Sequence, residues 1–163
     1  MPRIAPCLWF DHQAEEAATL YASIFPDSRI DRIHRSPADN PSTREGDVLT
    51  VDYTVLGMPF IGLNGGPDFT FSEAISISVE CENQAEIDYY WDALLADGGQ
   101  ESVCGWLKDK FGVSWQIVPK RMAQLMDGDD RDGARRAMEA MLKMVKLDIA
   151  ELEAAYRGEP VHA

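Results

Sequence analysis

The chain carries one pattern of elements twice, and this duplication limits the folds open to it more than any other feature. In each copy an apolar strand precedes a cap candidate, an amphipathic helix and about three further apolar strands. The cap candidates, Asp11 and Asn83, are offset by about 70 residues, a period that suits a repeated supersecondary unit. The sequence therefore predicts an α+β fold of two βαβββ modules followed by C-terminal helices.

The first copy is expected to open with a strand over Ile4–Phe10. A helix follows Asp11, and its apolar residues fall near one side: Ala14, Ala17, Ala18, Tyr21, Ile24 and Phe25. The remaining strands of this copy are predicted at Arg29–Arg35, Val48–Leu56 and Met58–Leu63.

The second copy is expected to open with a strand over Ala74–Cys81. Asn83 and Glu86 have the spacing of a capping box, in which the two side chains satisfy free backbone N–H groups. The helix that follows is amphipathic, with Ile87, Tyr90, Trp91, Leu94 and Leu95 on one side. Its remaining strands are predicted at Glu101–Val103, Cys104–Leu107 and Ser114–Pro119.

The pattern places the first module at residues 1–67, the second at 68–126 and a helical extension at 127–163, together forming one domain. From Asp129 onward an apolar stripe indicates a helix: Ala134, Met138, Met141, Leu142 and Val145. Asp148 and Glu151 resemble a second capping box and predict a final helix. Two interpretations fit Met138, Met141 and Met144, either a ligand surface or a helical core and dimer contact.

Composition excludes several functions. A net charge of −13 argues against nucleic-acid binding, which needs a basic surface. No apolar run approaches the ~20 residues of a membrane helix. The three cysteines, Cys7, Cys81 and Cys104, form no CxxC pair, and the histidines have no metal-binding spacing. We therefore expect a cytoplasmic protein without a metal or a cofactor.

The segment 104–119 is the strongest candidate for a site. Its two strands flank the polar turn Lys108–Gly112, so it reads as a β-hairpin. Alternation places Ser114 and Gln116 on one face, and Trp115 and Ile117 on the other. Gln116 lies between apolar residues, where an amide is costly unless it finds partners. It is expected either to be satisfied by protein neighbours or to point into a pocket.

Five segments of the sequence resemble those of a known family. The segments are LWFDHQAEEAATLYASIFPDSRI, LNGGPDFTFSEAISISVEC, QAEIDYYWDALLADGG, CGWLKDKFGVSWQIVP and AMLKMVKLDIAELEAAY. They are similar to the PhnB-like family, widely labelled 3-demethylubiquinone-9 3-methyltransferase, within the glyoxalase/bleomycin-resistance/dioxygenase (vicinal oxygen chelate) superfamily. The resemblance covers Ile4 to Tyr156. It implies paired βαβββ modules and a homodimer, with the modules paired within one chain or exchanged between two.

The resemblance also implies where a metal would be held, namely by His, Gln or Glu on the opening and closing strands of each module. This chain offers at those positions Pro6 or Leu8, Ile61 or Leu63, Ser76 or Ser78, and Gln116. Gln116 is the one plausible ligand, and three or four ligands are normally needed. The methyltransferase label lacks the glycine-rich first turn of a Rossmann-like sheet, because Gly65-Gly66 precedes a proline and Gly98-Gly99 closes a helix.

We predict a ligand pocket with aromatic walls from Trp9, Phe71, Trp106 and Trp115, and polar points at Ser76, Cys104 and Gln116. This composition suits an aromatic or quinone-like small molecule. The tryptophans could instead fill the core, and Cys104 could be a nucleophile or an inert thiol. The expected function is small-molecule binding without the usual metal centre. Alternatives are a metal-dependent lyase or dioxygenase-type enzyme with an atypical site, or the methyltransferase of the family label.

Overall fold

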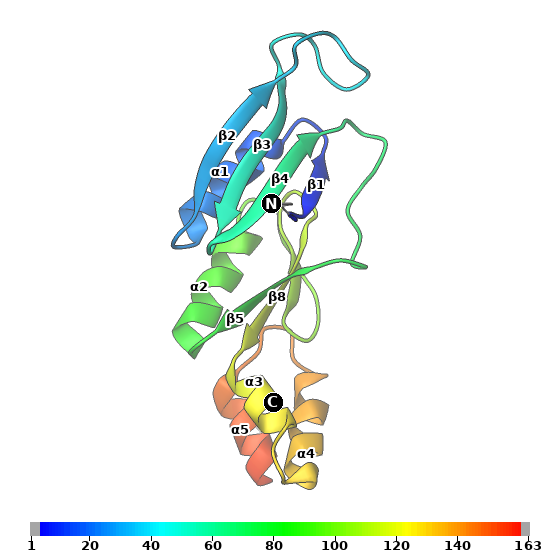
Figure 1. Ribbon diagram of the computed structural model, residues 1–163. Helices are drawn as coiled ribbons and strands as arrows, with labels where there is room; N and C mark the ends of the chain where they lie inside the picture. The colour runs from blue at the N-terminus through cyan, green and yellow to red at the C-terminus, as the bar shows by residue number, and fades with distance from the viewer. Residues whose placement is uncertain (1–3, 161–163) are drawn as a thin grey trace. The chain divides into compact units, whose positions relative to one another are not determined.

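The computed structural model describes residues 4–160 and divides the chain into two compact units, with the boundary between Phe71 and Ser72. Each unit contains a four-stranded mixed sheet and a helix between its first and second strands (Figure 1). The second unit also contains the C-terminal helices. The predicted α+β fold of two βαβββ modules followed by C-terminal helices is therefore confirmed.

The first unit has the strand order β1-β4-β3-β2. Strand β1 runs parallel to β4, and the other neighbours are antiparallel. Its elements are β1 (Cys7–Phe10), α1 (Ala14–Ile24), β2 (Arg29–Arg35), β3 (Val48–Val55) and β4 (Met58–Asn64). The first strand is shorter than the predicted Ile4–Phe10, and the others lie within one residue of their predicted ends.

Helix α1 packs on its sheet through small residues. Ala14, Ala17 and Ala18 are fully buried, so the helix backbone can approach the sheet closely. A β-carbon on Gly62 of β4 would lie 3.1 Å from the Ala14 β-carbon. Beneath the helix Tyr53 stacks on Phe60, with ring centroids 5.5 Å apart. The apolar side predicted for this helix is the side that forms the core of the first unit.

The start of helix α1 corrects one prediction. Asp11 is exposed and does not cap the helix, which begins at Ala14 after the N-cap residue Gln13. The cap comes from the last residue of β4, because Asn64 accepts a hydrogen bond from Ala14 N–H at 2.9 Å. The Asn64 amide also donates to the Val48 carbonyl at 2.9 Å. One buried side chain thus joins α1, β3 and β4.

Replacing Asn64 by alanine is expected to lower the free energy of unfolding by about 2–3 kcal/mol. The reason is that it leaves a helix N–H and a strand carbonyl without partners. Asn64→Asp keeps the acceptor for Ala14 and loses the donor for Val48, so an intermediate loss is expected. Urea denaturation followed by circular dichroism measures both. A loss below about 0.5 kcal/mol for the alanine variant would show that Asn64 does not join these elements.

The second unit repeats the topology, with the strand order β5-β8-β7-β6 and β5 parallel to β8. Its elements are β5 (Ile77–Cys81), α2 (Gln84–Leu95), β6 (Gln100–Glu101), β7 (Trp106–Lys108) and β8 (Ser114–Pro119). The predicted hairpin is confirmed, although strand β7 begins two residues later than predicted. Cys104 has φ 59° and Gly105 φ 79°, so the chain turns before it becomes extended.

The two N-caps predicted from capping-box spacing are found, but the reciprocal glutamate bond to the cap residue is seen at neither helix among residues 4–160. Asn83 accepts from Glu86 N–H at 3.0 Å, and Asp148 accepts from Glu151 N–H at 2.9 Å. The Glu86 carboxylate accepts from Glu82 N–H at 2.8 Å, one residue before the cap. Both helices therefore begin where the sequence predicts.

Three helices follow the second sheet: α3 (Arg121–Met126), α4 (Arg131–Met141) and α5 (Ile149–Arg157). Leu125, Met144, Leu147 and Leu152 form their core. The predicted stripe on α4 is wrong in part, because Met138, Leu142 and Val145 are exposed. Helix α4 ends at Met141 and buries its small residues Gly133, Ala134 and Ala137. Met138 therefore faces outward, and Leu142 and Val145 lie beyond the helix, whereas Met141 packs against the core. Helix α3 was not predicted.

No helix among residues 4–160 combines the length and the apolar character needed to cross a bilayer.

Candidate functional site

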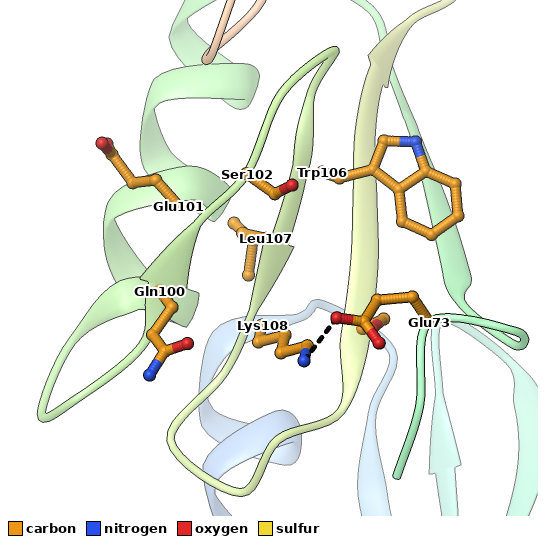
Figure 2. Close-up of a pocket in the computed structure, with 8 residues that line it drawn as sticks. Glu73, Gln100, Glu101, Ser102, Trp106, Leu107 and Lys108 are labelled. Carbon is orange, nitrogen blue, oxygen red and sulfur yellow. Dashed lines mark ion pairs between the residues drawn. The ribbon is translucent and has the colours of Figure 1, made fainter.

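A pocket of about 130 Å³ lies in the second unit, on the open face of its sheet, opposite helix α2 (Figure 2). Polar side chains dominate its lining, with one indole among them: Glu73, Gln100, Ser102, Trp106, Lys108 and Ser114. Leu107 and Glu101 complete the lining. The volume suits a small ring compound or a few water molecules.

Strand alternation explains which side chains reach this face. Trp106 and Lys108 are two residues apart on β7, so they project to the same side of the sheet. Leu107 lies between them and is buried on the other side. Glu101 points away from Glu73 in Figure 2 and accepts a hydrogen bond from the Trp91 indole of α2 at 3.2 Å. Its carboxylate is therefore committed to the helix side.

Lys108 occupies the centre of a row that crosses three strands. Gln100 of β6 and Ser114 of β8 are both register partners of Lys108. Directly paired residues have their β-carbons about 4.5–5.5 Å apart, so the three side chains start as neighbours. The row gives the pocket an amide, an ammonium and a hydroxyl at close quarters.

The Lys108 ammonium forms an ion pair with Glu73, with Nζ and Oε1 2.5 Å apart (Figure 2). This hydrogen bond, with a smaller contribution from the backbone of Glu73 itself, lowers the pKa of the Glu73 carboxyl. The Glu73 carboxyl is therefore ionised at neutral pH. Glu73 is reached through a turn before β5, whereas Lys108 stands on a strand.

Ser114 is the unusual member of the lining. Ser114 is 2% exposed, and its Oγ has no hydrogen-bond partner among the described residues 4–160. A buried hydroxyl without a partner costs roughly 1–3 kcal/mol. Native proteins keep few such groups, and each of them requires a reason.

Three predicted site residues share the open face. Gln116 lies beside Trp106 in the register of β7 and β8, and its amide donates to Ser76 Oγ at 2.8 Å. Gln116 therefore has a protein partner, which is one of the two outcomes that the sequence predicts for it. Trp106 lines the pocket and is half-buried.

Trp115, one of the predicted pocket residues, lies in the hydrophobic core of the second unit. It lies on the helix side of β8, is 1% exposed, and donates its indole N–H to Asp109 Oδ2 at 2.9 Å. Asp109 is itself buried and accepts from the N–H groups of Phe111 and Val113. This carboxylate organises the turn between β7 and β8, a role that the sequence analysis missed.

Trp9 and Phe71 belong to the first unit. Trp9 is half-buried, donates its indole N–H to the Gly66 carbonyl at 2.8 Å and meets Phe69 edge to face at 5.0 Å. Phe71 packs in the same manner against Phe10, at 5.2 Å. Within their unit these rings fasten the segment that leaves β4.

Two of the three thiols are disfavoured as nucleophiles by their burial. Burial raises the pKa of the Cys81 thiol to about 12, so it stays protonated at neutral pH. Burial also raises the pKa of Cys7. Cys104 is half-buried in a left-handed turn, and its N–H donates to the Met144 carbonyl at 2.8 Å. Its position is structural.

Of the predicted pocket residues only Trp106 lines this pocket, and sequence reasoning missed the other seven lining residues: Glu73, Gln100, Glu101, Ser102, Leu107, Lys108 and Ser114. Lys108 was placed in the turn, whereas strand β7 extends to include it. Continuing the alternation from Trp106 would have put Lys108 on the pocket face. Glu73 carried no such signal, because its partner lies 35 positions away along the chain.

The side chains of residues 4–160 do not assemble the ligand set of a usual metal centre. Among residues 4–160, no three His, Cys, Asp or Glu side chains gather as a ligand set. Gln116, the one plausible ligand, uses its amide on Ser76. The glycine pairs do not fit a Rossmann-like cofactor turn either, since Gly99 N–H closes α2 on the Leu95 carbonyl and Gly65 N–H bonds to Phe10.

The fold defines the class: an α+β protein of tandem βαβββ modules. The chain belongs to the 3-demethylubiquinone-9 3-methyltransferase family, whose sequence pattern matches residues 2–118. The family expected from the sequence is thus confirmed.

Solved structures agree with this placement. A PhnB protein from Bacillus cereus is 35% identical over 72% of this chain and 99% of its own, with a TM-score of 0.64. A protein from Pseudomonas aeruginosa is 20% identical over 73% of this chain and 98% of its own, with a TM-score of 0.54, and shows the shared fold. No protein with a curated description matches the chain.

Proposed function

We propose that this chain is a small-molecule-binding protein whose ligand occupies the pocket on the open face of the second sheet. The observation that carries this proposal is Ser114: the residue lines the pocket, and its buried Oγ has no hydrogen-bond partner among residues 4–160. A ligand atom that hydrogen-bonds to Ser114 Oγ would remove the cost of leaving it unsatisfied. The half-buried Trp106 indole, which lines the same pocket as Ser114, offers a flat apolar surface for a ring of the ligand.

Catalysis has less support than binding. Burial keeps the Cys81 thiol protonated, and the carboxylates near the pocket are engaged with Lys108 and Trp91. Between residues 4 and 160 the donor set for a metal is lacking. Methyl transfer is a poorer fit still, because the glycine pairs are used inside the fold. The homodimer and the cytoplasmic location expected from the sequence stay predictions.

Titration with benzamide, a neutral ring compound of suitable size, tests the proposal by NMR on ¹⁵N-labelled protein. We expect the Trp106 indole signal and the backbone signals of Lys108 and Ser114 to shift, with a dissociation constant on the order of 1 mM for so small a ligand. Trp106→Phe assigns the indole signal. A spectrum in which these three signals stay still contradicts the proposal.

Ser114→Ala supplies the decisive comparison. Removing an unsatisfied buried hydroxyl should leave the free energy of unfolding unchanged or raise it by about 1 kcal/mol, while benzamide binds about fivefold more weakly. Ser102→Ala is the matched control, because Ser102 lines the same pocket but is exposed. If Ser114→Ala instead destabilises the protein by more than about 1 kcal/mol, the hydroxyl serves the fold and not a ligand.

A further inference from the structure

The chemistry of the pocket indicates more than an unspecified small molecule. Its central row offers hydrogen-bond donors: the Lys108 ammonium, flanked in register by the Gln100 amide and the Ser114 hydroxyl. Trp106 lies two residues from Lys108 on the same face. A carboxylate is the small group best suited to accept from an ammonium and a hydroxyl together.

We propose that the ligand is a planar ring bearing a carboxylate, and that Lys108 binds this carboxylate in place of Glu73. This inference rests on the proposed function and specifies the substrate class of the same site. In the free protein Glu73 occupies the position of the ligand's anionic group, because its Oε1 lies 2.5 Å from Lys108 Nζ. Glu73 is then an internal competitor that keeps the ammonium paired until the ligand arrives.

The exposures of the two partners show which of them a ligand can replace. The Lys108 side chain is 32% exposed and is fixed on strand β7, whereas the Glu73 side chain is 62% exposed and follows a turn. A displaced Glu73 can return to water, and an ion pair so exposed contributes little net stability. Lys108 without a partner would leave its charge in a mostly enclosed position. Exchanging the Glu73 carboxylate for a ligand carboxylate on Lys108 therefore costs little free energy.

A cationic ligand fits less well. It would have to pair with Glu73 while lying next to the Lys108 ammonium, where like charges repel. Glu101 offers no second anionic partner, because its carboxylate accepts from the Trp91 indole on the helix side. The net charge of −13 disfavours anions at long range, but salt screens that field within about 8 Å at physiological ionic strength. Contacts in the pocket decide the specificity.

Benzoate, benzamide and benzylamine test this inference, because they place a negative, a neutral and a positive group on one ring. Each is titrated into the full chain, and the Trp106 indole signal is followed. We expect benzoate to bind tightest. Lys108→Met should weaken benzoate at least roughly tenfold and leave benzamide within about twofold. Glu73→Gln should tighten benzoate roughly threefold by removing the competitor.

Lys120→Met is the matched control, since Lys120 forms a comparable exposed ion pair with Glu82 at 2.8 Å in the same unit. It should leave benzoate binding unchanged. Benzylamine binding tighter than benzoate, or benzoate binding unaffected by Lys108→Met, would overturn the inference and leave the pocket proposal intact. If none of the three compounds shifts the signals of Trp106, Lys108 and Ser114, the proposed function itself fails.

Discussion

Replacing Asp109 by alanine is expected to lower the free energy of unfolding by about 3–5 kcal/mol, the largest effect that we predict for a single side chain. Its carboxylate accepts from the N–H groups of Phe111 and Val113 and from the Trp115 indole, at 2.9–3.0 Å. Asp109 is 3% exposed and Trp115 is 1% exposed, so water cannot replace the lost acceptor. Each buried donor left unsatisfied costs roughly 1–3 kcal/mol.

Two further variants separate charge from geometry. The Asp109→Asn amide has only one oxygen. If this oxygen accepts from the turn, the NH₂ group faces the Trp115 N–H; in the opposite orientation the turn contacts are lost. In either case the free energy of unfolding should fall by about 2–3 kcal/mol. Asp92→Ala, at an exposed position on α2, should change the stability by less than about 0.5 kcal/mol. Urea denaturation measures all three. An Asp109→Ala variant as stable as Asp92→Ala would refute the role assigned to this carboxylate.

Replacing Gly105 by alanine is expected to cost about 3 kcal/mol, the second large effect. Gly105 has φ 79°, where a β-carbon is strained by about 1–2 kcal/mol. The new atom would also lie 2.8 Å from the Ile117 carbonyl oxygen and 3.0 Å from the Leu147 side chain. The backbone cannot move away freely, because Gly105 N–H bonds to the Val145 carbonyl and Ile117 N–H bonds to the Gly105 carbonyl, both at 2.8 Å.

Gly112 provides the control in the same unit. Its φ is 85°, almost the same as that of Gly105, but a β-carbon there meets nothing within 4 Å. Gly112→Ala should therefore cost only the backbone strain, about 1 kcal/mol. The difference between the two variants in thermal or urea unfolding isolates the collision. Equal losses would mean that the turn at Gly105 relaxes around the new methyl group.

The fold was predictable wherever the governing contact is local. The caps at Asn83 and Asp148 each bond to an N–H three residues later, so spacing alone reveals them. The cap of α1 comes from Asn64, fifty positions away, and no local pattern points to it. Asp11 was assigned instead because it is the nearest residue of a suitable type.

The candidate site was predictable only in part, for a related reason. Alternation correctly put Ser114 and Gln116 on one face of β8 and Trp115 on the other. Hydrophobicity then favoured tryptophans as pocket walls, but Trp115 satisfies its indole on buried Asp109. Composition cannot distinguish an indole that lines a pocket from one that fills a core. The hydrogen-bond partner of the indole N–H does distinguish them.

The two sheets share one strand order, yet their open faces differ in chemistry. On β4 the residues that alternate with the buried ones are Pro59, Ile61 and Leu63, whereas β8 has Gln116 and Val118 there, next to Ser114. The first sheet therefore has an apolar face and the second a mixed polar one, although both are built on one strand order. Substitutions on one face of the second sheet can alter its polarity while the strand order and the core behind it stay the same.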